Sequence, residues 1–393
     1  MQDDGAGTLV PSVCACARHD EPAPVPRFPH LHTPTVAVGA NHLQIYTCGS
    51  ALYDAMLTAI DGAQERIYLE SFIWKDDTVG REFKERLARK AAAGVAVYVI
   101  FDGFGNAVVP RAFKTFPAPI HALEYHAMRQ AWHVLDPRRF VTNHRKLLVV
   151  DGHIGFLGGF NLGALYRTEW RDTHVALEGP AAADLAHAFV QFWNAHGPRR
   201  DRIRWREPRQ FVSSIQLWGN DALRLTFPIR NMYLAAFDRA ERHIFLTNAY
   251  FLPDPALLAG LKVAAARGVD VQVLVPWRSN HAVVDWVARG YFEPCLRAGI
   301  RVFGYRAAML HAKTCTIDGQ WTTIGTANLD RLSGVGNFEL NAELYSEAVA
   351  GQMAAIFACD RASAHELTLA EWARRPWHTK LSERLLAPLR FLL

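Results

Sequence analysis

Two stretches of the chain carry the same residues at the same spacing, and these residue types can perform phosphoryl chemistry. Both read His-x-Lys-x-x-x-x-Asp, over residues 144–151 and again over residues 311–318. An imidazole can attack phosphorus or transfer a proton, and an ammonium group can neutralise the oxygens of a phosphodiester. One match to so short a pattern would be weak evidence, but a second copy in the same chain predicts a phosphoryl-transfer site.

The repeat continues beyond the motifs at one constant offset, which is the separation of His144 from His311. At this offset Asn161 aligns with Asn328, and the acidic residue Asp172 aligns with the acidic residue Glu339. Gly-rich turns also follow both motifs. Chance matches would not keep these polar residues in register, so we predict a duplication that places one set of reactive groups in each half of the chain.

The spacing within each motif predicts that its histidine and its lysine act together. Each motif runs into an apolar stretch typical of a strand, in which alternate side chains share a face. His144 therefore points the same way as Lys146. The same holds for His311 and Lys313. If the two copies meet at a pseudo-twofold interface, one histidine can form a covalent phosphohistidine while the other protonates the departing oxygen.

Four further polar residues could complete such a site. Asn161 and Asn328 could donate hydrogen bonds to the phosphoryl oxygens. Each imidazole also needs a carboxylate to fix its tautomer, and Asp172 and Glu339 are the candidates because both follow a motif histidine at the same spacing. Isolated residues of these types are usually surface or turn residues, and the duplication in register is what favours the catalytic interpretation.

Asp151 and Asp318 end the two motifs. Each precedes a glycine at the predicted end of a strand, where an Asp-Gly turn is a sufficient explanation. We therefore favour a structural role for both residues and keep direct catalysis as the alternative.

Composition limits the class of protein independently of the motifs. Half of the 393 residues are hydrophobic, which is enough for two domains with sizeable cores. The formal charge of +5 favours an anionic partner such as phosphate, a lipid headgroup or nucleic acid, although a solubilising surface explains it equally well. The six cysteines include no Cys-x-x-Cys pair, so neither a disulfide framework nor a zinc site is indicated, and we expect no metal or cofactor. No window reaches the roughly 18 apolar residues of a membrane span, which predicts a soluble or peripheral protein.

From about residue 40 the chain alternates between patterns typical of strands and of helices, and the later half repeats the order of the first. Helical apolar spacing covers residues 52–59, 83–93, 231–242 and 255–266, and β-rich runs cover residues 67–74, 95–102, 244–251 and 269–275. This βαβ rhythm predicts the α/β class, with two tandem domains whose mixed, mostly parallel sheets are related by pseudo-twofold symmetry.

The domain boundaries follow from changes in composition. We expect a flexible Pro/Ala-rich tail over 1–36, a first domain over 40–198, a basic linker over 199–209, a second domain over 210–370, and a basic, aromatic segment over 371–393. For the linker we favour a solvated connector, with a basic surface near an anionic substrate as the alternative. The C-terminal segment suits either an interfacial anchor on anionic lipid or a last helix packed on the protein.

Taken together, these residues resemble the phospholipase D superfamily, whose signature is the paired His-x-Lys-x-x-x-x-Asp motif. The likeness covers about residues 40–360 and is closer to the bacterial cardiolipin synthase branch, in the shorter type that lacks two N-terminal membrane spans. The closer matches are Gln-Glu-Arg-Ile-Tyr-Leu-Glu-Ser-Phe-Ile-Trp at 64–74, Gly-Gly-Phe-Asn at 158–161, Trp-Arg-Asp-Thr-His at 170–174, Thr-Ala-Asn-Leu-Asp at 326–330 and Asn-Phe-Glu at 337–339.

The resemblance implies two similar α/β domains that share one active site, and catalysis through phosphohistidine without a metal. It makes His144 and His311 the nucleophile and the general acid/base, with His144 the usual nucleophile. The phosphate ligands would be Lys146, Lys313, Asn161 and Asn328, and the residues that orient the histidines would be Asp172 and Glu339. Residues 331–336 depart from the Arg-Ser-Phe that these synthases usually carry there, which bears on the choice of acceptor.

The reaction implied by the resemblance is phosphatidyl transfer. One phosphatidylglycerol forms phosphatidyl-histidine and releases glycerol, and a second phospholipid alcohol attacks this intermediate to give cardiolipin. Water as acceptor would make the same site a hydrolase, a phosphodiesterase or nuclease could use the same histidines, and an inactive lipid-binding module could keep the fold. We expect anionic phospholipid rather than nucleic acid as the partner, and a peripheral location on the cytoplasmic side of the cell membrane.

Overall fold

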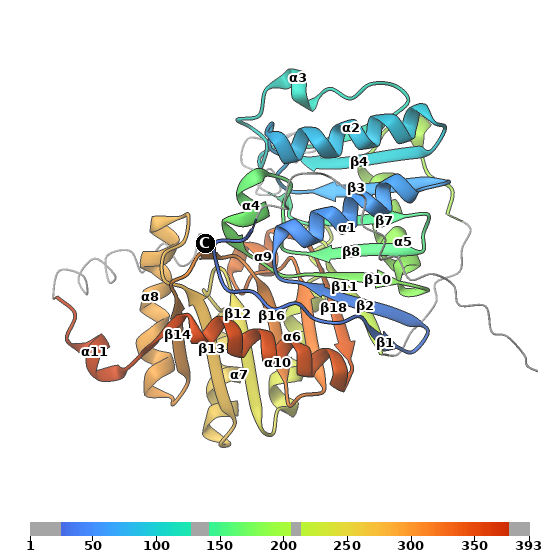
Figure 1. Cartoon of the computed structure of the whole chain (residues 1–393). Coiled ribbons are helices and arrows are strands. Elements are labelled where there is room, and N and C mark those ends of the chain that lie inside the picture. The colour runs from blue at the N-terminus through green and yellow to red at the C-terminus, as the bar shows by residue number, and fades with distance from the viewer. Residues whose placement is uncertain (1–24, 127–140, 206–213, 377–393) are drawn as a thin grey trace, which may run out of the picture.

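The computed structural model describes residues 25–126, 141–205 and 214–376, which form two α/β halves stacked against each other (Figure 1). The first half is coloured blue to green in Figure 1 and the second yellow to red, and each contains one large sheet with helices on its faces. None of the helices in these ranges is long and apolar enough to cross a membrane. The prediction of two tandem α/β domains is confirmed.

The first half is built on one sheet of eight strands. The strands are β1 (Val36–Val38), β2 (Asn41–Tyr46), β3 (Arg66–Ser71), β4 (Ala96–Asp102), β5 (His121–Tyr125), β7 (Leu147–Val150), β8 (Ile154–Gly158) and β10 (His174–Glu178). Their order in space is β1-β2-β10-β8-β7-β3-β4-β5. The helices are α1 (Gly49–Gly62), α2 (Thr78–Ala92), α3 (Arg111–Lys114), α4 (Ala164–Thr168) and α5 (Ala181–His196). Helices α1 and α2 pack on one face of the sheet and α5 on the other.

The second half repeats this plan. Its strands are β11 (Ile215–Asn220), β12 (His243–Asn248), β13 (Asp270–Pro276), β14 (Arg301–Tyr305), β16 (Lys313–Ile317), β17 (Trp321–Gly325), β18 (Asn337–Tyr345) and β19 (Ala364–Leu367), in the spatial order β11-β18-β17-β16-β12-β13-β14-β19. Its helices are α6 (Pro228–Arg239), α7 (Pro255–Ala266), α8 (Ala282–Arg297), α9 (Arg331–Val335), α10 (Glu347–Ala362) and α11 (Leu369–Ala373). Three short strands, β6 (Thr142–Asn143), β9 (Trp170–Arg171) and β15 (Met309–Leu310), run between the halves.

The sheets are mixed, as predicted, but the expectation that they are mostly parallel is wrong. Within the two large sheets, the parallel neighbours among the described strands are β3–β4 and β4–β5 in the first half and β12–β13, β13–β14 and the short pair β6–β18 in the second. The remaining neighbours in these sheets are antiparallel, and they include the hairpins β7–β8 and β16–β17 in which each motif strand turns straight back. The βαβ rhythm predicted the parallel pairs between successive strands correctly, but it did not predict these hairpins.

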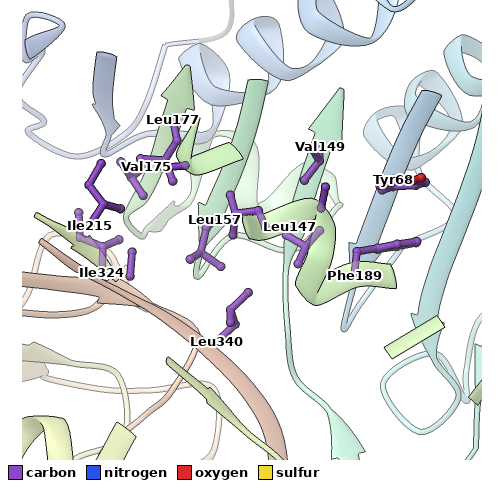
Figure 2. Close-up of a cluster of buried hydrophobic side chains, with 14 of the residues drawn as sticks. Tyr68, Leu147, Val149, Leu157, Val175, Leu177, Phe189, Ile215, Ile324 and Leu340 are labelled. Carbon is purple, nitrogen blue, oxygen red and sulfur yellow. The ribbon is translucent and has the colours of Figure 1, made fainter. Parts of the chain in front are cut away.

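A shared hydrophobic core joins the two halves (Figure 2). Leu147 of β7 and Leu157 of β8 belong to the same buried cluster as Ile324 of β17 and Leu340 of β18, and Figure 2 shows these side chains between the two sheets. Because alternate residues of a strand face opposite ways, the neighbour Leu148 instead enters the core under α1 and α2. Burial of both faces of the motif strand therefore holds it in place beside the other half.

Residues 25–36, which were expected to lie in a flexible tail, pack on the first half. The ring of Phe28 is buried. The Gln44 side-chain amide donates to the carbonyl oxygen of Thr33 at 2.6 Å. Side-chain hydrogen bonds of this kind can order a proline-rich segment that lacks a helix or a full strand. The rest of the predicted tail, residues 1–24, lies outside the described residues.

The predicted C-terminal segment is described as far as residue 376. Helix α11 packs on α8 through Trp372, whose ring centroid lies 5.3 Å from that of Phe292. This part is a helix packed on the protein, and the interfacial anchor remains a prediction for residues 377–393, which lie outside the described residues. The end of the predicted linker, residues 206–209, also lies outside them, so its role stays a prediction.

The Asp-Gly turns after the motifs close the two central hairpins. Asp151 and Asp318 have φ angles of 53° and 55°, in the left-handed region that few residues other than glycine adopt. The Asp151 carboxylate accepts the backbone N–H groups of residues 64–66, each at 2.8 Å, and the Asp318 carboxylate accepts those of residues 241–243 at the same distance. These bonds tie each turn to the start of the neighbouring strand, β3 or β12.

Replacing Asp318 with alanine should destabilise the fold. Asp318→Ala removes the acceptor of three backbone N–H groups, and we expect the free energy of unfolding, measured by chemical denaturation, to fall by about 2–3 kcal/mol. Asp318→Asn should lose less, because asparagine tolerates a positive φ and keeps one acceptor oxygen.

The difference in the free energy of unfolding between wild type and Asp318→Ala should depend on pH. Burial raises the pKa of Asp318, but the three backbone N–H groups outweigh it and leave the pKa below its usual value. The contribution of Asp318 is therefore present at neutral pH and is lost as the pH falls through the folded-state pKa, so wild type and Asp318→Ala should converge in acid. A stability difference that does not change with pH would contradict this account.

Candidate active site

Two short ladders between the halves bring the motifs together. Strand β6, just before His144, pairs in parallel with the start of β18, and β15, just before His311, pairs in parallel with β9. The backbone N–H of His144 donates to the carbonyl oxygen of Phe338 at 3.0 Å, and that of His311 donates to the carbonyl oxygen of Arg171 at 2.7 Å. Equivalent positions in the two ladders are separated by the offset of the sequence repeat, so the repeat is also a symmetry of contacts.

Because of these ladders, each acid meets the histidine of the other half. The Nδ1 atom of His144 lies 3.0 Å from Oε1 of Glu339 and 3.1 Å from its Oε2, and Nδ1 of His311 lies 2.5 Å from Oδ2 of Asp172. All four side chains are buried. With a carboxylate at Nδ1, the Nε2 atom of each imidazole is the one available for chemistry. The shared spacing after the motif histidines identified the acids, but it did not reveal that the pairs are crossed.

The two lysines lie beside the histidines and belong to the same charged cluster. Lys146 Nζ donates to the carbonyl oxygen of His144 at 2.6 Å, and Lys313 Nζ donates to the carbonyl oxygen of His311 and lies 3.0 Å from its Nδ1. The charge of each lysine also reaches across the interface: Lys313 lowers the pKa of His144, and Lys146 lowers the pKa of His311. The four side chains therefore act as one site.

Burial controls the protonation of the side chains in this site. It lowers the pKa of Lys146 to about 7 and that of Lys313 to about 8. It also lowers the pKa of His144 and, together with the charge of Lys313, lowers the pKa of His311 to about 3. Burial alone would raise the pKa of Asp172, but Lys313 and His311 hold it below its usual value. At neutral pH the site thus presents neutral imidazoles, carboxylates and lysines that are close to losing their charge.

The two aligned asparagines differ in their contacts. Asn161 Oδ1 accepts the backbone N–H of Ile73 at 3.0 Å, and its Nδ2 donates to the Tyr166 hydroxyl at 3.0 Å. Asn328 is also buried, yet its Oδ1 has no hydrogen-bond partner among the described residues. An unpaired buried acceptor is unfavourable, and it is a place where a hydroxyl group of a substrate can donate a hydrogen bond. A phosphoryl oxygen would instead need the Nδ2 donor of an asparagine, so the role of both residues as phosphate ligands stays a prediction.

Asp151 and Asp318 lie at the far ends of their strands from the histidines. Their carboxylates are occupied by the backbone N–H groups of the turns. These contacts support the structural role that the Asp-Gly turns suggested, rather than direct catalysis.

A buried polar network lies behind His144, and the spacing of the motifs does not predict it. Glu70 Oε2 accepts from Arg145 at 2.7 Å, and its Oε1 accepts from Asn143 Nδ2 at 2.6 Å. The backbone N–H of Asn143 in turn donates to Asp102 Oδ2 at 2.8 Å. The positions aligned with Asn143 and Arg145 in the second motif are apolar. The available signal was a glutamate within an apolar β-rich run, where a charge is stable only with a partner.

In the pair of His311 and Asp172, the acid is held in place by contacts of its neighbour Arg171. Arg171 forms a bidentate pair with Asp360 of α10, with Nε–Oδ1 at 2.9 Å and Nη2–Oδ2 at 2.7 Å. Arg171 Nη1 also donates to the carbonyl oxygen of Asp172 and, at 2.9 Å, to Thr173 Oγ1. Both charged side chains are buried, so the pair has a fixed geometry and holds the backbone of Asp172 against the second half.

Aromatic rings contact both histidines. The ring of Phe72 lies 4.8 Å from that of His144. Around His311, the ring centroids of Trp170, Tyr166 and Tyr250 lie 5.2, 6.1 and 6.2 Å away. These rings lower the polarity around the imidazoles, which strengthens every charge interaction within the site.

The arrangement suits covalent phosphoryl transfer. It offers two imidazoles whose Nδ1 atoms are held by carboxylates and two lysines that can neutralise a phosphodiester. Within the described residues there is no group of three or more His, Cys, Asp or Glu side chains that could hold a metal ion.

Comparison with known proteins agrees with this geometry. Residues 56–193 and 233–361 match the family described as "Cardiolipin synthase, PLD-like domain". The chain belongs to this family. Members with similar sequences include cardiolipin synthases of Staphylococcus aureus (strain Mu50), 32% identical over 370 residues, and of Geobacillus thermodenitrificans (strain NG80-2), 32% identical over 366 residues. Each alignment covers 89% of this chain, and it covers 74% of the first relative and 72% of the second.

Solved structures show the same fold at lower identity. The crystal structure of phosphatidylserine synthase from Haemophilus influenzae Rd KW20 is similar with a TM-score of 0.67 and 14% identity, over 89% of this chain and 93% of that one. Polyphosphate kinase from Porphyromonas gingivalis is similar with a TM-score of 0.55 and 13% identity, over 90% of this chain and 53% of that one. These likenesses concern the fold. As a member of the cardiolipin synthase family, this protein is a phospholipase D-type phosphatidyltransferase that acts on phospholipid.

The crossed pairing predicts that a change in the first half disturbs the histidine of the second. In Asp172→Asn the amide can hold the wrong tautomer of His311, so we expect transfer activity to fall by about 10²–10⁴-fold with the fold intact. The Nδ1 signal of His311 in nitrogen NMR should shift, while that of His144 should stay close to its wild-type position. Asp318→Asn, at the far end of a motif strand, is the matched control. A shift at His144 instead of His311 would show that the pairs are not crossed.

The lysine pKa values predict how substrate binding depends on pH. Above about pH 8 both lysines lose their charge, because burial lowers the pKa of Lys146 to about 7 and of Lys313 to about 8. Binding of a phosphodiester then requires each lysine to take up a proton, so we expect KM to rise by about a hundredfold per pH unit above that point. In Lys313→Arg the guanidinium stays charged and only Lys146 titrates, so the slope should fall to about tenfold per pH unit. A KM that is constant up to pH 10 would exclude this role.

Proposed function

We propose that this enzyme condenses two molecules of phosphatidylglycerol to cardiolipin and glycerol through a phosphohistidine intermediate. The observation that carries the proposal is the pair of crossed dyads, His144 with Glu339 and His311 with Asp172, in one buried site with two lysines. Two histidines are what a two-step displacement at phosphorus requires, one to become phosphorylated and one to move protons. The cardiolipin synthases among its relatives support the choice of lipid.

In the first step, Nε2 of one histidine attacks the phosphorus of phosphatidylglycerol. A P–N bond forms, the P–O bond to the glycerol headgroup breaks, and the second histidine gives its proton to the departing glycerol oxygen. Lys146 and Lys313 neutralise the non-bridging oxygens while charge develops on them. The products of this step are phosphatidyl-histidine and free glycerol.

In the second step, a hydroxyl of another phosphatidylglycerol attacks the same phosphorus. The second histidine, now neutral, takes the hydroxyl proton as a P–O bond forms, and the P–N bond breaks to release cardiolipin. The second histidine gives a proton to an alcohol oxygen in the first step and takes one from an alcohol oxygen in the second, so one general acid/base serves both steps. Water in place of the second lipid would give phosphatidic acid.

We assign His144 as the nucleophile and His311 as the acid/base. The 2.5 Å contact between His311 and Asp172 is a short, charge-assisted hydrogen bond that favours a protonated imidazole. Burial and the charge of Lys313 lower the pKa of His311. A bound phosphodiester anion opposes the charge of Lys313 and so raises that pKa toward the range that a general acid needs.

We further propose that the enzyme works as a peripheral protein on the cytoplasmic side of the cell membrane. The phospholipid substrate supports a membrane location, and the mild positive charge of the chain suits an anionic surface.

The proposal is tested by product formation from defined substrates. Wild type, His144→Ala and His311→Ala are incubated with phosphatidylglycerol vesicles and, separately, with single-stranded DNA. Cardiolipin and glycerol formed by wild type alone are the expected result, with losses of at least about 10⁴-fold in both variants. Phosphatidic acid alone would indicate a hydrolase, nucleotide release without lipid products a nuclease, and no product a lipid-binding module. Each of these three outcomes would overturn the proposal.

The assignment of the two histidines has its own test. Phosphatidyl-p-nitrophenol has a leaving group that departs without a proton, so a variant that lacks only the general acid should still release nitrophenolate in a first-turnover burst. We expect the burst in His311→Ala and its absence in His144→Ala. The reverse pattern would exchange the two roles.

A further inference from the structure

Exposed apolar side chains gather around the active site. They are Phe104, Val108, Leu165, Val283 and Leu332, and each is between 44% and 83% exposed. We call these five residues the apolar rim. A single exposed apolar residue needs no explanation, but a group of them around one site does.

In the first half, the rim is attached directly to the surroundings of His144. Phe104 and Val108 lie in the loop that follows β4. Within that loop, Asn106 Nδ2 donates to the carbonyl oxygen of Phe72 at 2.8 Å, and Phe72 is the ring that contacts His144. One hydrogen bond and one ring contact thus connect the exposed loop to the catalytic imidazole.

In the second half, the corresponding loop after β13 makes an equivalent connection to His311. The Tyr250 hydroxyl donates to Asn280 Oδ1 at 2.6 Å, and the same ring packs on His281 and on His311. Val283 follows in the first turn of α8. The rim therefore repeats with the pseudo-twofold symmetry of the site.

The remaining two rim residues are themselves a symmetric pair. Leu165 in α4 and Leu332 in α9 occupy equivalent positions of the sequence repeat, and both are exposed. The neighbour of Leu165, Tyr166, turns inward to a ring-centroid distance of 6.1 Å from His311. Helices α4 and α8 lie at the left of their halves in Figure 1. Tyr166 of α4 and Tyr250, which binds Asn280 just before α8, both contact the ring of His311, so these rim elements of the two halves meet at one site.

Positive charge accompanies the apolar rim. Arg111, Arg278 and Arg331 are exposed and lie close in sequence to the three parts of the rim. Within the described part of the chain, no ion pair is recorded for any of them, in contrast to Arg167, which pairs with Asp54. Apolar side chains flanked by unpaired arginines are complementary to a bilayer with anionic headgroups.

We propose that the apolar rim and its three arginines dock on an anionic lipid surface, so that phospholipid reaches His144 and His311 directly from the bilayer. This inference rests on the proposed function, because it takes the substrate to be a membrane lipid. Docking on this side would let a lipid move from the bilayer into the site with its acyl chains still shielded from water.

Vesicle sedimentation tests the docking surface. Leu165→Ser/Leu332→Ser removes the symmetric pair, and we expect the affinity for phosphatidylglycerol vesicles to fall about tenfold or more. Val263→Ser, which changes a comparably exposed apolar residue of α7, is the control and should bind like wild type. Arg111→Glu/Arg331→Glu should weaken binding to phosphatidylglycerol vesicles further than binding to phosphatidylcholine vesicles.

Two further readouts separate the possible outcomes. The ratio of transfer rates on vesicles and on dispersed short-chain phosphatidylglycerol should fall in the rim variant. Wild-type vesicle binding without any transfer would overturn the proposed function and leave the docking surface standing. Normal vesicle binding by both rim variants of an active enzyme would overturn the docking surface. A changed oligomeric state in sedimentation velocity, with vesicle binding unaltered, would assign the rim to an interface between two copies of the chain and would also overturn it.

Discussion

The active site depends on backbone pairing between the halves. Two short ladders fix the positions of the motif histidines and of their acids, because the residue after the paired positions is a histidine on one strand and an acid on the other. Once the ladders form, His144 must lie beside Glu339 and His311 beside Asp172. Neither half contains a complete dyad, so the catalytic unit exists only when the interface and its shared core are assembled.

The site is symmetric in geometry but not in electrostatics. Its histidines and acids obey the sequence repeat, whereas the groups that support them do not. Arg145 belongs to a charged network behind the first-motif histidine, while the bidentate pair of Arg171 and Asp360 supports the acid of the other dyad. Asn161 is fully engaged and the Oδ1 of Asn328 is not, within the described residues. A duplicated fold has thus acquired two different environments, which is what two different roles in one reaction require.

Much of the fold and of the candidate site can be predicted from the sequence, and the features that cannot be predicted have physical reasons. A constant offset reveals which residues correspond, so the tandem α/β halves could be predicted and a candidate catalytic set could be proposed. An offset cannot show which residues touch, and the crossed pairs therefore came only from the structure. The parallel pairing was overestimated because βαβ patterns are visible in sequence while the hairpin partners of the motif strands are not. Glu70 and Asp360 escaped notice because a buried ion pair joins residues with no fixed separation in sequence.

Burial of the site also bears on the choice between alcohol and water as acceptor. Burial lowers the pKa of Lys146 to about 7 and that of Lys313 to about 8, so both ammonium groups lose their proton more easily than exposed ones. An anionic phosphodiester stabilises the charged form of both lysines, which is the form that the proposed reaction needs. Rings around both histidines, including Phe72 and Trp170, make the surroundings of the imidazoles apolar. Apolar surroundings favour a lipid alcohol over water as the acceptor in the reaction that we propose.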